Sequence, residues 1–371
     1  MSTVYSKQIQ TTQYETALPS ATGMIIRQKE PVNLESPLDV LNSFATPSDL
    51  FYVRSHFKAP ELTTTSYRLR IHGAVENTLN LDYQQLTELP SETRMATLEC
   101  AGNGRVFLVP QAEGTQWELG AVGNAWWTGV PLRVLLEQAG LSRNAREVVF
   151  QGADRGTPKE QPIPPGPISY ARSLPLATAV RPDVLVVYEM NGRELSQDHG
   201  YPVRLVVPGY YGMASVKWLT SIHVVEEPFQ GYWQTIDYGY WDYIDGIPVR
   251  RPLSEMEVKS QIARPSIYEV VPAGSVYIVT GAAWSGKTDV SEVELSTDGG
   301  QHWTAAELVD PAQQHAWRRW RFAWNVPLAS GRYTLMARAR DANGAVQPKA
   351  HDPSHGSYVI NHTLPIDVIV R

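Results

Sequence analysis

The sequence predicts an α+β fold that is mainly β and ends in an immunoglobulin-like β-sandwich. Before Pro252, apolar and β-branched runs that end in Gly or Pro recur along the chain, which is typical of buried strands joined by loops. One amphipathic helix interrupts them. The composition shifts near Pro252, and about seven short strands follow within roughly 115 residues, a spacing typical of a β-sandwich.

A chain of 371 residues is long enough for two or three domains with sizeable cores. Residues 1–45 are polar and interrupted by Pro, so we expect an N-terminal arm or loop there. A first folded domain is expected at residues 46–252 and the sandwich at residues 253–371.

The elements follow from hydrophobic periodicity. Before the composition shift we expect a strand of alternating character at 66–75, a helix at 131–141 that ends at Gly140, and buried strands at 146–154, 184–192 and 203–212. In the sandwich we expect strands at 276–284, 290–300, 318–326, 331–341 and 364–370, with turns at 298–300 and 341–344. The loops at the strand ends are the expected location of site residues.

The net charge and the N-terminal sequence limit the partners and the location that we expect for this protein. The net charge of −6 argues against a nucleic-acid partner, which requires a basic face. The N-terminus has no apolar leader segment and no lipidation motif, and no run of 18 apolar residues occurs. We therefore expect no membrane partner and a cytoplasmic location, or a periplasmic one if a leader has been removed.

Cys100 is the single cysteine, in the stretch TLECAGNGR. A lone cysteine is most often a small core residue. Here Gly102 and Asn103 permit a tight turn, and Arg105 adds a positive charge that favours a thiolate. Such a thiolate can be a nucleophile or one soft metal ligand. No HExxH, CxxC or HxH motif accompanies it, so a bound metal would take most of its ligands from a non-protein group.

Further polar clusters lie at strand ends. They contain Arg54 and His56, Asp154, His199 and Arg204, and Ser215 and Lys217. Each cluster alone is more often structural than functional. Together they could supply donors to an anionic, phosphate-bearing heterocyclic ligand.

Several separated blocks resemble the sulfite oxidase family of molybdenum enzymes. These are TLECAGNGR, GAVGNAWWTGVPLRVLL, DHGYPVRLVVPGYYGMASVKWL and GYWQTIDYGYW, followed by GAAWSG, VELSTDGGQHW and RARDANGAVQP. They occur in family order from about Leu50 to the end of the chain. The resemblance implies a molybdopterin-binding domain of sulfite oxidase type, of the bacterial or plant-like form without a haem domain, followed by a molybdenum-cofactor dimerisation domain.

The resemblance also assigns site residues. Cys100 matches the thiolate ligand of molybdenum, with two further sulfurs from the pterin. The expected cofactor-binding residues are Tyr52, Val53, Arg54, Ser55, His56, Asp154, His199, Arg204, Ser215, Val216 and Lys217. Arg54, Arg105, Trp127 and Tyr238 match positions that line the family's substrate pocket, where arginines suit an oxyanion.

Two departures from the family pattern affect the anion pocket. Many relatives have two arginines after the Asn of the cysteine motif, whereas this chain has Gly104 and Arg105. Where some relatives have an arginine before a Gly near the C-terminus, the nearest residue is His355, which would be charged only at lower pH.

The resemblance implies that the protein oxidises sulfite to sulfate by oxygen-atom transfer, with one molybdenum-molybdopterin per chain. No CxxCH motif occurs, so we expect no haem and an external electron acceptor, either a cytochrome, another acceptor or dioxygen. A homodimer is expected. The alternatives are a related molybdoenzyme that reduces a sulfoxide or another oxyanion, and a non-catalytic binding protein.

Overall fold

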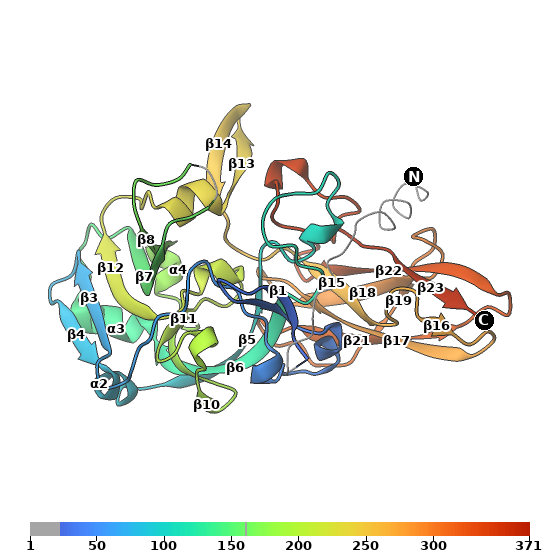
Figure 1. Ribbon diagram of the computed structural model, residues 1–371, viewed down its shortest axis with the longest axis horizontal. Helices are drawn as coiled ribbons and strands as arrows, with labels where there is room; N and C mark the ends of the chain where they lie inside the picture. The colour runs from blue at the N-terminus through green and yellow to red at the C-terminus, as the bar shows by residue number, and fades with distance from the viewer. Residues whose placement is uncertain (1–22, 160–161) are drawn as a thin grey trace.

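The computed structural model describes residues 23–159 and 162–371. Figure 1 shows an elongated molecule with a mixed α+β lobe at one end and a β-sandwich at the other, near the C-terminus. The predicted fold class is confirmed. In the described ranges, no helix has the length and apolar character needed to cross a membrane.

A mixed five-stranded sheet forms the outer part of the first lobe, in the order β4-β3-β12-β7-β8. β3 pairs in parallel with β12, and the other pairs are antiparallel. The strands are β3 (Arg68–Gly73), β4 (Leu79–Asp82), β7 (Glu147–Gly156), β8 (Ile168–Pro175) and β12 (Leu219–Val225). Exposed and buried side chains alternate along most of β3, as its sequence pattern predicts.

A second, antiparallel sheet continues toward the sandwich, in the order β10-β9-β6-β5 with β11 paired to β9. Its strands are β5 (Glu92–Glu99), β6 (Val122–Pro131), β9 (Leu185–Met190), β10 (Arg193–Glu194) and β11 (Arg204–Val206). β5 is an edge strand, and Cys100 follows directly after its last residue.

The helices are few and short. The predicted helix is α3 (Leu132–Ala139), which buries one apolar face and ends at Gly140 in a positive-φ conformation. The others are α2 (Tyr83–Thr87), α4 (Leu176–Ala179), η1 (Leu38–Asn42), η2 (Ser48–Leu50), η3 (Arg105–Phe107), η4 (Gln197–His199), η5 (Gly212–Ala214), η6 (Tyr232–Asp237) and η7 (Pro353–His355).

The C-terminal part is a two-sheet sandwich with the orders β15-β17-β21-β20 and β16-β23-β22-β18-β19. It has nine strands rather than about seven. The prediction missed some of them because strands of only two residues leave no clear pattern in the sequence. The nine strands are β15 (Lys259–Arg264), β16 (Val270–Val271), β17 (Val276–Trp284), β18 (Val290–Ser296), β19 (Thr304–Ala305), β20 (Glu307–Leu308), β21 (Arg318–Asn325), β22 (Gly331–Asp341) and β23 (Ile366–Val370).

Two small hairpins flank the sheets. Part of the predicted N-terminal arm lies outside the described residues, and the remainder contains β1 (Ile25–Gln28) and β2 (Asn33–Glu35). The second hairpin, β13 (Gly239–Ile244) and β14 (Ile247–Pro252), projects from the first lobe (Figure 1).

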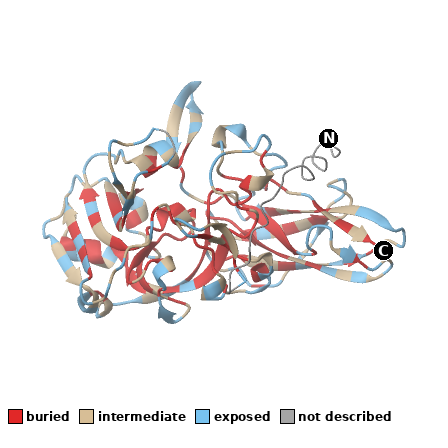
Figure 2. Ribbon diagram, in the orientation of Figure 1, coloured by how far each residue is buried: buried red, intermediate tan, exposed pale blue. Residues whose placement is uncertain are grey.

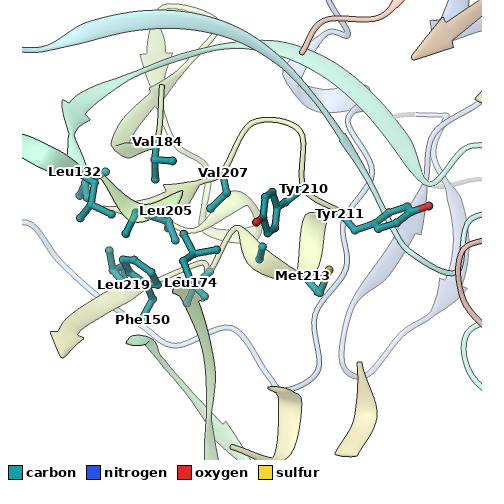
Figure 3. Packing of buried hydrophobic residues seen from close by; sticks show 14 of the residues in the cluster. Leu132, Phe150, Leu174, Val184, Leu205, Val207, Tyr210, Tyr211, Met213 and Leu219 are labelled. Carbon is teal, nitrogen blue, oxygen red and sulfur yellow. The ribbon is translucent and has the colours of Figure 1, made fainter. Parts of the chain in front are cut away.

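The apolar core of the first lobe extends into the sandwich at Ala282, Trp284 and Trp317, and most of the sandwich packs around a second core. Buried segments concentrate along the middle of the sheets (Figure 2). In the first lobe, residues from both sheets pack together between α3 and the strands, and Figure 3 shows Leu132, Phe150 and Leu205 in this cluster. Met213 belongs to the same cluster and also lines the pocket described next. The apolar core of this lobe therefore continues up to the lining of the pocket.

Candidate functional site

An open pocket lies where loops from both sheets of the first lobe meet the end of β5. Its free volume is about 670 Å³, counting the solvent at its mouth. It is lined by Phe51, Tyr52, Arg54, Ser55, His56, Leu98, Cys100, Ala101, Asp154, Tyr170, Asp198, His199, Arg204, Gly212, Met213, Ser215, Lys217, Trp218 and Tyr238.

Cys100 borders this pocket at the start of a tight turn. Its N–H donates to the Ala121 carbonyl at 2.9 Å, and its carbonyl accepts from the Asn103 N–H at 2.8 Å. Gly104 has a φ of 102°, a conformation that an arginine at this position would adopt only with strain. The glycine at this position, one of the two departures from the family pattern, therefore fits this turn without strain.

The electrostatics around the thiol have opposing contributions. The pKa of Cys100 is raised overall, because burial outweighs the lowering by the guanidinium groups of Arg105 and Arg54, so the positive charge of Arg105 does not offset burial here. Binding a metal would replace the thiol proton and offset the cost of burying the thiolate charge. A cysteine bordering a pocket between two cations differs from a simple core residue, so the structure favours the metal-ligand interpretation.

Two further cations line the pocket. Arg204 is 5% exposed and donates to the carbonyls of His199 at 3.0 Å and Ser215 at 3.1 Å. Lys217 donates to the Ser55 hydroxyl at 2.8 Å and to a neighbouring carbonyl. Burial lowers the pKa of Arg204 to about 10, and burial with the nearby Arg204 charge lowers that of Lys217 to about 7. A bound anion would stabilise the charged form of each side chain.

Burial shifts the pKa values of one acid and two imidazoles of the pocket. Burial raises the pKa of Asp154 to about 7, against the attraction of Lys217. Burial with nearby cations lowers the pKa of His199 to about 3 and that of His56 well below its usual value. Both imidazoles are therefore neutral near pH 7, and His199 Nε2 lies 3.1 Å from the Ser48 carbonyl.

Tyr238 and His56 form a polar pair on the pocket wall. The His56 Nε2 to Tyr238 Oη distance is 2.8 Å. Burial raises the pKa of Tyr238, so its phenol keeps its proton near pH 7. The pair can therefore present a hydroxyl donor to an oxygen atom of a bound anion.

Trp127, predicted to wall the substrate pocket, does not line it. Its side chain is fully buried, and its Nε1–H donates to the Ala96 carbonyl at 3.2 Å. Its ring packs against Phe51 and lies 5.1 Å from the Arg204 guanidinium carbon. Trp127 thus lies behind lining residues, because its strand turns this side chain into the core.

Four other sequence-predicted positions also lie off the pocket lining. Val53 and Val216 are buried apolar neighbours of lining residues. Arg105 is buried and donates to the Thr115 carbonyl at 2.8 Å and to the Ser357 carbonyl at 3.2 Å. His355, the weakest sequence match, is in η7 against the Tyr240 ring, 5.1 Å between centroids, so it does not replace the missing pocket arginine.

Some lining residues escaped the sequence analysis. They are Phe51, Leu98, Ala101, Tyr170, Asp198, Gly212, Met213 and Trp218. Asp198 directly precedes His199, so its motif could have indicated it. Tyr170 comes from β8, in a segment without any chemical motif, and only the sheet pairing brings it here.

The donor set of the pocket fits a metal held by a cofactor. Among residues 23–159 and 162–371, no group of three or more His, Cys, Asp and Glu is arranged to hold a metal ion. One thiol borders the pocket, together with cations suited to phosphate. The residues present therefore fit molybdopterin, which brings two sulfur ligands and a phosphate of its own.

Comparisons with known proteins match both lobes of the chain. The oxidoreductase molybdopterin binding domain matches residues 56–233, and the Mo-co oxidoreductase dimerisation domain matches residues 250–359. The chain is 36% identical to sulfite oxidase of Gallus gallus, covering 90% of this chain and 75% of that protein. It is 34% identical to sulfite oxidase of Arabidopsis thaliana, covering 91% of each.

A solved structure extends the likeness to the fold. The sulfane dehydrogenase SoxCD from Paracoccus pantotrophus has a TM-score of 0.78 and 29% identity, covering 95% of this chain and 86% of the other. Fold, pocket and relatives all lead to one assignment: the chain belongs to the sulfite oxidase family of molybdopterin oxidoreductases.

Proposed function

We propose that this protein is a molybdenum-dependent enzyme that oxidises sulfite to sulfate and passes the electrons to an external acceptor. The observation that carries the proposal is the placement of Cys100, the single cysteine, in a pocket with Arg54, Arg204 and Lys217. The relatives named sulfite oxidase support the same reaction.

The residues of this chain bind, orient and donate protons. When bound, the molybdenum-pterin group supplies two-electron oxygen-atom-transfer chemistry. Arg204 and Lys217 would hold its anionic part, and Cys100 would be the protein ligand. Arg54 would bind the sulfite anion, while neutral His56 with its hydrogen on Nε2 would leave the Tyr238 hydroxyl free to donate to a substrate oxygen.

Elemental analysis and one assay panel test this proposal. Protein from a cofactor-competent host should contain molybdenum and reduce an artificial electron acceptor when sulfite is added. Thiosulfate is tested with the same acceptor, and dimethyl sulfoxide and nitrate are tested with a reduced dye as electron donor, since these assays separate sulfite oxidation from related chemistries. A molybdenum-loaded protein that acts on one of these and not on sulfite would overturn the proposal, and a protein without molybdenum would favour a binding role.

The first prediction concerns Lys217 and cofactor retention. Replacing Lys217 with Met removes a half-buried cation while keeping most of the side-chain volume. Losing one partner of such a charge pair costs about 2–5 kcal/mol, or at least about thirtyfold in affinity. We expect molybdenum per chain to fall sharply after gel filtration. Lys287→Met, which removes a surface ion pair with Glu257, is the control and should keep its molybdenum.

The second prediction concerns assembly. We expect a homodimer formed through residues 253–371, the region that contains most of the match to the dimerisation domain. Val276, Ile278 and Leu328 are apolar and exposed on this sandwich, at 63%, 49% and 86%. A two-fold contact is the commonest arrangement for identical chains. Sedimentation at micromolar concentration should give twice the chain mass, and a monomer would contradict this prediction.

A further inference from the structure

A buried ion pair joins the residue before the cysteine to the C-terminal sandwich. Lys259, at the start of β15, lies 2.8 Å from the Glu99 carboxylate at the end of β5. Both side chains are only 2% exposed. The other Glu99 oxygen accepts from Trp284 Nε1 at 2.8 Å, and Trp284 is the strand partner of Lys259 in the sandwich.

The same lysine also contacts the cysteine turn itself. Lys259 Nζ donates to the Asn103 carbonyl at 3.0 Å. The Asn103 side chain donates to Glu99 at 3.1 Å and accepts from the Ala121 N–H at 3.1 Å. Since Asn103 also bonds the backbone of Cys100, the ammonium group holds both ends of the turn that carries the thiol.

A second contact fixes the strand that leads into this turn. The Thr97 N–H on edge strand β5 donates to the His315 carbonyl of the sandwich at 2.8 Å. The sandwich therefore contacts the free edge of β5 through the backbone at Thr97 and through side chains at its last residue, Glu99. Lys259 itself does not line the pocket, so its effect on any bound group must pass through the turn.

We propose that Lys259 is a positioning residue that sets the placement of the Cys100 thiolate from the neighbouring domain. The inference rests on the proposed role of Cys100 as a metal ligand. Outer groups that orient metal ligands commonly change affinity or activity when they are replaced. A buried ion pair is weak evidence for stability, because an apolar pair of similar volume is often as stable, so its hydrogen bonds to the turn are the better explanation.

The single cysteine gives a test that needs no cofactor. In cofactor-free protein, a thiol reagent such as a disulfide dye reports on Cys100 alone. We expect Lys259→Met to raise the rate of Cys100 modification severalfold. The control is Arg319→Met. This change removes an ion pair with Asp310 and a hydrogen bond to the Asn42 carbonyl, and Arg319 contacts neither Glu99 nor Asn103. Its rate should equal that of the wild type.

The holoenzyme gives the second test. In Lys259→Met we expect bound molybdenum with a changed Mo(V) electron paramagnetic resonance signal, and a loss of kcat of about 10–100-fold with little change in KM. If this variant does not fold, Glu99→Gln combined with Lys259→Met removes the unpaired charge, and the same two measurements apply to it. Wild-type thiol reactivity and a wild-type Mo(V) signal in a folded variant would overturn the inference.

The two tests keep this inference separate from the proposed function. A wild-type protein that binds molybdenum but does not oxidise sulfite refutes the reaction and leaves the Mo(V) comparison valid. A wild-type protein that oxidises sulfite, with variants whose thiol and Mo(V) properties are unchanged, refutes the role of Lys259 alone.

Discussion

A Cys100→Ser variant is expected to keep its fold and most of its molybdenum while losing nearly all sulfite oxidation. Serine has almost the same size, so the turn formed with Asn103 and Ala121 can persist. Its hydroxyl is a harder and poorly ionised ligand, whereas a coordinating thiol gives up its proton readily. The contacts that Arg204 and Lys217 would make to the pterin do not involve this side chain.

The expected loss of turnover exceeds about a hundredfold, since replacing groups that only support a ligand already costs about 10–100-fold. Molybdenum per chain and sulfite-dependent acceptor reduction should be measured on the same preparation. A variant with both molybdenum and near-normal turnover would remove Cys100 from the metal site.

Most of the fold could be predicted because its strands have clear local patterns. Apolar and polar residues alternate along β3, and β9 and β17 are mostly apolar. The helix α3 ends at a glycine, so each of these elements was expected from its own residues. β5 was not expected: its first half is polar and its second half is buried on both faces, which hides the period of two. The predicted boundaries at residues 46–252 and 253–371 remain predictions.

The site was predictable where its residues lie in short motifs, as around Cys100 and His199. It was not predictable where placement depends on packing between distant segments. Trp127 lies in a family-like block, yet its strand turns the ring into the core behind Arg204. Lys259 lies in no motif, and only the docking of the sandwich onto β5 brings its ammonium to Glu99.

An Arg54→Gln variant is expected to bind its cofactor and lose sulfite oxidation at the substrate step. Arg54 lines the pocket, donates to the Ser55 carbonyl at 2.6 Å and lies near Asn33 Oδ1 at 3.3 Å. Burial lowers its pKa, but Tyr238 and Cys100 raise it overall, so the guanidinium remains charged. Arg54 therefore keeps a charged side chain on the pocket lining.

Removing one partner of a buried charge pair costs about 2–5 kcal/mol, so kcat/KM should fall about thirtyfold to several thousandfold. Arg54→Lys restores the charge without the planar fork of donors and should recover only part of this loss. Arg70→Gln, which changes an exposed arginine on β3, is the control and should leave kcat/KM unchanged. The decisive comparison is at equal molybdenum content. If Arg54→Gln then oxidises sulfite with a wild-type specificity constant, the anion is held by other groups, and Arg54 serves only to tie its loop to Asn33.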